Sequence, residues 1–174
     1  TPKRYMTALR FAADIETVMN WIGEPVILYG HSAGSGGAAI AASKNPGKIR
    51  LLFLEASYPV TREAMLSLYR WFNPVFGRLF GPAIVFLINL FYRNRLDDVD
   101  PARMAEHIHV PVMLLHGEKD GRFPVSFVYR IKEAFKKDQV TMYIGPGAGH
   151  SDTSKTPGYV PAVTAFLNKH LPVE

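Results

Sequence analysis

Short, mostly apolar runs alternate with longer amphipathic segments along this chain. The runs lie at 26–29, 49–54, 111–116 and 140–144. Apolar runs of this length are typical of parallel strands that are buried on both faces. Segments with helical spacing lie at 5–22, 36–44, 124–137 and 157–170. The pattern predicts an α/β fold, in which a parallel sheet of four strands is connected by crossover helices.

A glycine-rich motif follows the first apolar run directly. Gly30-His31-Ser32-Ala33-Gly34 stands between the strand at 26–29 and a helix of small residues. This arrangement lifts a serine onto a tight strand-to-helix turn and exposes its Oγ. The N-terminus of the helix favours a developing negative charge. The motif therefore predicts that Ser32 is a nucleophile. Small residues are expected to let the helix pack closely on the strand: Gly30, Ala33, Gly34, Gly36 and Gly37.

A serine nucleophile needs a histidine base, and the histidine needs a carboxylate to orient it. Asp120 lies in the turn after the strand at 111–116, and His150 ends the loop after the strand at 140–144. Loops at the carboxyl ends of parallel strands meet at one edge of the sheet. Asp120 and His150 are therefore the candidate acid and base.

Three segments of the chain resemble the α/β-hydrolases: GHSAG at 30–34, VPVMLLHGEKD at 110–120 and GPGAGH at 145–150. The resemblance covers nearly all of the 174 residues. It implies that Ser32 is the nucleophile, Asp120 the acid and His150 the general base. It also implies that the backbone N–H of Ala33 donates to an oxyanion.

Other residues compete for these roles. Glu55 follows the strand at 49–54, where some hydrolases of this fold, by resemblance, carry the acid. We expect His31 to pack in the turn or line the site, and His116 to have a structural or supporting role. The remaining ionisable candidates are expected at the surface or in solvated loops: His107, His109, His170, Glu118 and Asp152.

A long insertion separates the second and third predicted strands. We expect residues 1–56 and 110–174 to form the hydrolase core and residues 57–109 a helical cap, which resembles hydrolase lids at this position. The apolar run at 83–92 is too short to cross a bilayer and is interpreted as a helix of the cap. An apolar cap would exclude water and offer a slot for an acyl group. Contact with a membrane surface is the alternative, because arginines flank the apolar stretches: Arg70, Arg78, Arg93 and Arg95.

Composition narrows the chemistry further. The chain has no cysteine, which excludes disulfides, zinc–thiolate sites and a cysteine nucleophile. No group of side chains has convincing metal-ligand spacing, so neither a metal nor a cofactor is expected. The net charge is +5, but the basic residues are dispersed and no nucleic-acid motif is present. The compartment remains open from the sequence, with the cytoplasm favoured.

An α/β-hydrolase has, by resemblance, eight strands, and the predicted four match its last four. The strands before the nucleophile and the loop for a second oxyanion donor are not recognised in the sequence. We therefore expect the first strand to have an open edge, which a missing N-terminal segment, another polypeptide or a second copy would cover.

The predicted function is a serine hydrolase that cleaves carboxylic esters with an apolar group through an acyl-enzyme. Cleavage of an amide or peptide, a thioester or a lysophospholipid is the alternative for the same three residues. A non-catalytic binding module on the same fold is a further alternative.

Overall fold

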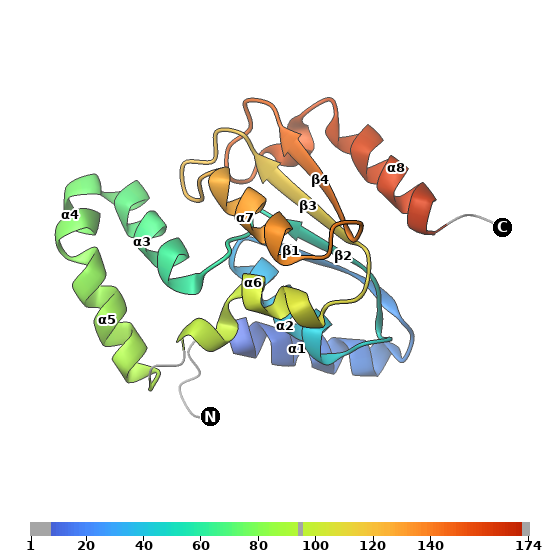
Figure 1. Ribbon diagram of the computed structural model, residues 1–174, viewed down its shortest axis with the longest axis horizontal. Helices are drawn as coiled ribbons and strands as arrows, with labels where there is room; N and C mark the ends of the chain where they lie inside the picture. The colour runs from blue at the N-terminus through green and yellow to red at the C-terminus, as the bar shows by residue number, and fades with distance from the viewer. Residues whose placement is uncertain (1–7, 94–95, 172–174) are drawn as a thin grey trace.

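The computed structural model describes residues 8–93 and 96–171. Its strands form one parallel sheet in the order β1-β2-β3-β4 (Figure 1). Their bounds are Val26–His31 for β1, Ile49–Glu55 for β2, Val112–Gly117 for β3 and Val140–Gly145 for β4. The prediction of a four-stranded parallel α/β sheet is therefore confirmed.

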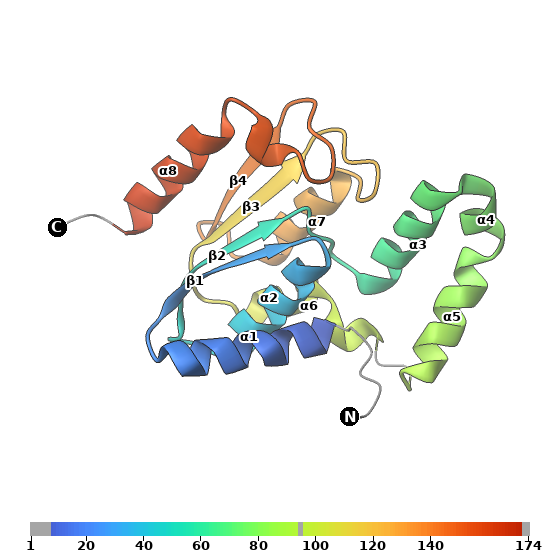
Figure 2. The same cartoon turned by 180° about the vertical axis from the view of Figure 1, so that it is seen from behind.

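Helices cover both faces of the sheet. Figures 1 and 2 show α1 and α2 on one side and α8 on the other. Leu52 and Leu54 of β2 contribute to the apolar core beneath α1, α2 and α7, whereas Leu51 and Phe53 face Phe166 of α8. Successive side chains of a strand point to opposite faces, so a continuous apolar run supplies both cores. The helices are α1 (Ala8–Ile22), α2 (Ala33–Lys44), α7 (Ser126–Ala134) and α8 (Tyr159–His170).

Most predicted elements begin or end within about two residues of the observed ones, with two larger differences. Helix α2 begins at Ala33 rather than at 36, because the chain enters the helix directly after Ser32. Helix α7 is shorter than the predicted 124–137, because Phe135 has an extended backbone and its buried ring packs into the core. The start of the first predicted helix, at 5–7, lies outside the described residues.

The insertion between β2 and β3 is helical, as expected. Its first three helices, α3 (Thr61–Phe72), α4 (Pro74–Leu79) and α5 (Gly81–Phe91), project from the sheet and its covering helices (Figures 1 and 2). The segments that follow, η1 (Leu96–Val99), α6 (Pro101–Met104) and η2 (Ala105–His107), return to the body, where α6 and η2 pack against α2 and α7. The division into core and cap domains stays a prediction.

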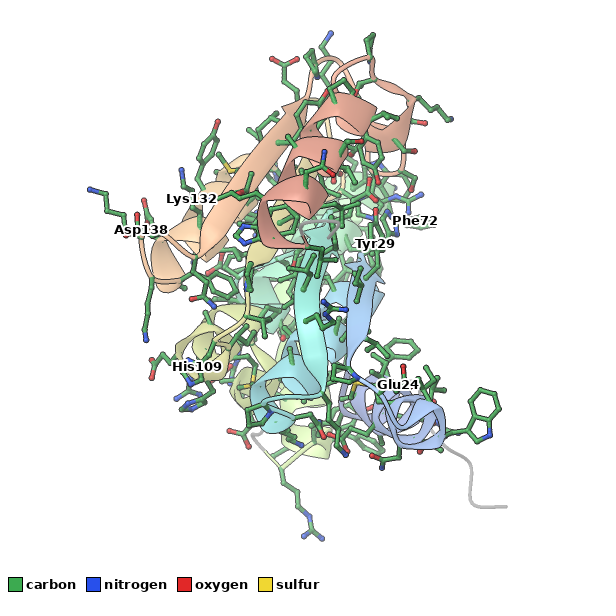
Figure 3. The ribbon with its side chains drawn as sticks, turned by 90° about the vertical axis from the view of Figure 1, so that its right-hand side faces the viewer. Glu24, Tyr29, Phe72, His109, Lys132 and Asp138 are labelled. Carbon is green, nitrogen blue, oxygen red and sulfur yellow. The ribbon has the colours of Figure 1, made fainter. Side chains whose placement is uncertain are left out.

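Strand β1 forms one edge of the described sheet and pairs there with β2. Ile27 and Tyr29 of β1 lie on the face of the sheet that α8 covers, and they are 47% and 45% exposed. Figure 3 shows Tyr29 at this edge, and its ring stacks on Phe53 with the centroids 5.9 Å apart. An apolar strand edge of this kind is suited to further pairing.

Candidate active site

Ser32 stands in a strained turn between β1 and α2. Its φ of 53° is unusual for a residue with a side chain. Two hydrogen bonds hold the turn: the Ser32 N–H donates to the Glu55 carbonyl at 2.9 Å, and the Ser35 hydroxyl donates to the Ser32 carbonyl at 2.6 Å. The Ser35 hydroxyl also lies 2.8 Å from Ser57 Oγ. These contacts fix the backbone of Ser32 between the sheet and the first turn of the helix.

Close packing of α2 on β1 requires glycine at position 30 but not at position 34. A Cβ atom added to Gly30 would lie 2.7 Å from both Ala38 Cβ and Ser35 Cα. At Gly34 the same atom would meet nothing within 4 Å. The expectation that Gly34 is small for close packing is therefore wrong, because position 34 lies on the open side of the helix.

This difference predicts opposite effects of two alanine substitutions. Gly30→Ala should lower the free energy of unfolding by about 1–3 kcal/mol, because the helix must move away from the strand. Gly34→Ala, the matched control, should leave stability unchanged or raise it by up to about 1 kcal/mol, because alanine favours a helix. Urea denaturation measures both effects. Equal effects of the two substitutions would contradict the packing argument.

Three side chains that are far apart in the sequence meet beyond the carboxyl ends of the strands. His150 Nε2 lies 2.8 Å from Ser32 Oγ, and His150 Nδ1 lies 2.7 Å from Asp120 Oδ2. A carboxylate only accepts hydrogen bonds, so Nδ1 carries the proton and Nε2 accepts from the serine hydroxyl. His150 and Asp120 are buried, whereas Ser32 is half-buried. The sheet thus brings together the three residues that the motifs singled out.

The Asp120 carboxylate is held by its own loop. Its Oδ1 accepts hydrogen bonds from the N–H groups of Arg122 at 2.8 Å and Phe123 at 2.9 Å. Burial by itself would raise the pKa of Asp120, but the hydrogen bonds from His150 and from these two N–H groups outweigh it, and the pKa is lowered. Asp120 is therefore an anion that points at His150.

Two neighbours fix the position of the His150 ring. The ring of Phe123 stands edge-on to it with centroids 5.1 Å apart. His31 Nε2 lies 3.1 Å from the His150 carbonyl oxygen, and the two imidazole rings are 5.3 Å apart. His31 therefore lines the site, as expected. The sequence analysis missed Phe123, because the residue lies in a loop and no motif spacing marks it.

No protein-family model matches the chain. Over 155 residues it is 28% identical to the alpha/beta hydrolase domain-containing protein WAV2 of Arabidopsis thaliana, and the match covers 84% of this chain and 48% of that protein. The structure superposes on a monoacylglycerol lipase of Paleococcus ferrophilus with a TM-score of 0.65 and 22% identity, over 97% of this chain and 78% of the lipase. The chain has an α/β-hydrolase fold. It spans about half the length of its curated relative.

A second superposition supports the same fold. The meta-cleavage product hydrolase of Pseudomonas fluorescens IP01 gives a TM-score of 0.67 at 15% identity, over 97% of this chain and 74% of the hydrolase. In this α/β-hydrolase fold the three meeting residues follow the order Ser, Asp, His. That is the order of the hydrolase triad.

His116 of β3 is fully buried behind the Asp120 loop. Its Nε2 lies 2.9 Å from the Phe123 carbonyl oxygen and 3.6 Å from Asp120 Oδ2. Burial lowers the pKa of His116, so the ring is neutral and Nε2–H donates to the Phe123 carbonyl. His116 therefore supports the loop that carries Asp120, in agreement with its expected structural role.

The buried neutral His116 predicts a pH-dependent stability. Because its pKa in the folded chain is lower than the ordinary 6.5, the unfolded chain takes up the proton first. The stability that neutral His116 contributes is full above the pKa of the ring in the unfolded chain. That stability is lost as the pH falls from there toward the lower pKa of the ring in the folded chain. Urea denaturation between about pH 7 and pH 5 should show a smaller decline for His116→Gln than for the unsubstituted chain. Equal slopes would refute this assignment.

Glu55, the alternative acid, lies elsewhere in the site. Its carboxylate accepts a hydrogen bond from the Tyr29 hydroxyl. Burial raises the pKa of Tyr29 most, and the hydrogen bond to Glu55 raises it further. Since His150 Nδ1 bonds to Asp120, the geometry favours Asp120 over Glu55 as the partner of the histidine.

The remaining ionisable candidates are exposed or make contacts with residues other than Ser32. His107 and His109 are exposed, as expected, whereas His170 is half-buried against the ring of Phe166 at 4.8 Å. Glu118 accepts from the Gly147 N–H at 2.8 Å and so connects the two loops of the site. Asp152 forms an ion pair with Lys155. Within residues 8–93 and 96–171, no group of side chains could hold a metal ion.

Proposed function

We propose that this α/β-hydrolase fold is a serine hydrolase that cleaves carboxylic esters with an apolar group. The observation that carries the proposal is the continuous hydrogen-bonded line from Ser32 Oγ through His150 to Asp120, with separations of 2.8 and 2.7 Å. A serine aligned in this way can transfer its proton to the imidazole as it attacks a carbonyl carbon.

In the proposed acylation step, His150 Nε2 accepts the proton of the Ser32 hydroxyl while Oγ forms a bond to the ester carbonyl carbon. The carbonyl oxygen becomes an oxyanion. We expect the N–H of Ala33 to donate to it, because Ala33 begins α2 and the first-turn N–H groups of a helix lack partners within the helix. When the bond to the alcohol breaks, His150 gives its proton to the leaving oxygen.

Deacylation repeats these transfers with water. His150 Nε2 accepts a proton from the attacking water, whose oxygen bonds to the acyl carbon. The bond to Ser32 Oγ then breaks and the serine recovers its proton. Throughout, the buried Asp120 carboxylate stabilises the positive charge that forms on the imidazole ring.

Two observations support an apolar ester. The Phe123 ring lies against His150, and Tyr58 packs edge-on against Phe123 at 5.5 Å, so a buried apolar cluster stands beside the histidine. Among the structural neighbours, one is described as a monoacylglycerol lipase and another as a membrane phospholipase A. The fold alone supports many reactions, so the site and not the likeness carries the proposal.

A panel of substrates tests the bond and the apolar group. The purified chain is incubated with p-nitrophenyl esters of increasing acyl length, a p-nitroanilide, a thioester and a lysophospholipid. We expect the esters to react fastest, with a higher kcat/KM for medium acyl chains than for acetate. If the anilide, the thioester or the lysophospholipid reacted faster than the esters, that compound's class would be the substrate class instead. A folded chain that binds these compounds without turnover would identify a binding module.

We further propose that another strand pairs with the free edge of β1. Two observations support this: Ile27 and Tyr29 are exposed, and no strand among the described residues pairs with the outer edge of β1. The occupant is either a further segment of a longer chain or a second copy, and light scattering over a concentration series tests for the copy.

A cytoplasmic location stays a prediction. In the described part of the chain, no helix combines the length and the apolar composition needed to cross a bilayer.

A further inference from the structure

One face of α5 is apolar and exposed. Its other face packs inward through residues spaced four apart, Gly81, Val85 and Asn89, which are buried. The outer face carries large side chains that are 56–64% exposed: Phe86, Leu87, Leu90 and Phe91. Large exposed apolar side chains that adjoin one another, rather than scattered ones, mark an interaction surface.

The exposed apolar surface continues over the neighbouring helices. We call the projecting hairpin of α3, α4 and α5, residues 61–91, the arm. Since α3 packs on both α4 and α5, these helices form one unit. Its far end exposes further large side chains: Phe72 at 80%, Val75 at 68%, Leu79 at 68% and Phe80 at 54%.

The charges of this region have one sign. From 64 to 93 the sequence contains three arginines and no acidic residue. Arg70, Arg78 and Arg93 are all exposed. By contrast, the charged pair at the base of α3 is neutralised, because Arg62 bonds to Asp97 and Glu63 to Arg130. The outer part of the arm is therefore both apolar and positively charged.

We propose that the arm binds the surface of an anionic lipid bilayer. Apolar side chains on short helices can enter the boundary between headgroups and acyl chains, while arginines bind the phosphates. The arginine side chains are long enough to reach the headgroups beside a buried apolar face. This combination favours a lipid surface over a protein partner, because every charge of the outer arm is positive and so opposite in sign to the charge of anionic lipids.

The arm is joined to the loop that carries Asp120. The Ser67 hydroxyl donates to the Arg122 carbonyl at 2.6 Å, and the Arg122 guanidinium lies 4.4 Å from the centre of the Trp71 ring. Helix α3 therefore lies between the outer arm, which would bind the bilayer, and the loop that carries Asp120. The proposal concerns lipid binding alone and does not depend on the proposed hydrolysis.

Co-sedimentation with vesicles tests the proposal. The chain is mixed with vesicles of phosphatidylcholine, with or without phosphatidylglycerol. We expect binding to the mixed vesicles that weakens at high salt. The double variant Arg70→Glu with Arg78→Glu should bind at least about 25-fold more weakly, from about fivefold for each arginine. Lys136→Glu with Lys137→Glu, two exposed lysines before β4, is the matched charge control and should bind normally.

The apolar contribution is tested in the same way. Phe86→Gln with Leu87→Gln should reduce binding at least about tenfold, because both side chains would otherwise leave water. Trp21→Gln is the control, since Trp21 on α1 is 86% exposed but lies outside the arm. Ser32→Ala should bind vesicles normally, which separates surface binding from occupation of the site. Circular dichroism verifies that each variant is folded.

Several results would overturn the proposal. One is a failure of the folded chain to bind vesicles that contain phosphatidylglycerol. Another is an equal loss of binding in the arm variants and their controls. A third is a dimer in solution that the double variant Phe86→Gln with Leu87→Gln converts to a monomer, when neither protein binds vesicles. The arm would then be a contact between copies of the chain.

Discussion

Ser32→Ala should abolish covalent labelling of the chain by a fluorophosphonate and lower kcat for ester hydrolysis by about 10⁶-fold. The probe reacts only with a serine oxygen that a neighbouring base activates. Ser32 Oγ lies 2.8 Å from Nε2 of His150, the proposed base. Mass spectrometry of the labelled protein should place the adduct on the peptide that contains Ser32.

Ser43→Ala is the matched control for this experiment. Ser43 lies in the last turn of the same helix, α2, and its hydroxyl bonds to the Ile40 carbonyl at 2.8 Å. The control variant should therefore label and turn over like the unsubstituted chain. A folded chain that takes no label, or an adduct that persists in Ser32→Ala, would contradict the proposed nucleophile.

Asp120→Asn should lower kcat by about 10⁴-fold while leaving the fold intact. An amide can donate its own N–H to His150 Nδ1, which stabilises the tautomer with the proton on Nε2. The histidine then cannot accept the serine proton. The amide also removes the negative charge that stabilises the imidazolium ring. Steady-state kinetics on the best ester of the panel, with circular dichroism of the same samples, measure the effect.

Glu55→Gln distinguishes the two possible acids. Glu55 is buried at the end of the neighbouring strand and accepts from Tyr29, so its substitution should reduce kcat by less than about tenfold. If Glu55→Gln were the more damaging of the two, the acid would be Glu55 and the observed contact between His150 and Asp120 would not be the functional one. Comparable losses would mean that both carboxylates support the histidine.

Much of the fold could be predicted because local patterns report burial directly. The apolar runs at 26–29, 49–54, 111–116 and 140–144 correspond to β1, β2, β3 and β4. Strands β2 and β3 are buried on both faces and need apolar side chains at successive positions, whereas β1 and β4 at the two edges are partly exposed although their runs are apolar too. The parallel direction of the strands could be predicted because helical segments lie between the runs, and the order β1-β2-β3-β4 came from the structure.

The candidate site was predictable for a related reason. Ser32, Asp120 and His150 each follow a strand at its carboxyl end, and parallel strands bring those ends together. The separation of 2.7 Å between His150 Nδ1 and Asp120 could not be predicted, because it depends on how the loops fold. The contact of Phe123 with His150 was not foreseen for the same reason: a side chain in a loop has no periodic neighbour to mark it.

The sequence by itself determined the strands, their parallel direction and the loops at whose strand ends the candidate nucleophile, acid and base lie. The strands follow from the pattern of apolar positions, and the turn at Ser32 follows from its glycine-rich motif, in which close packing requires glycine at position 30. Only the tertiary structure decided between Asp120 and Glu55, assigned Gly34 to open space and placed the apolar side chains of the arm at the surface. Apolar residues at helical spacing are equally suited to a core and to an exposed face, and only packing between distant segments determines which of them water reaches.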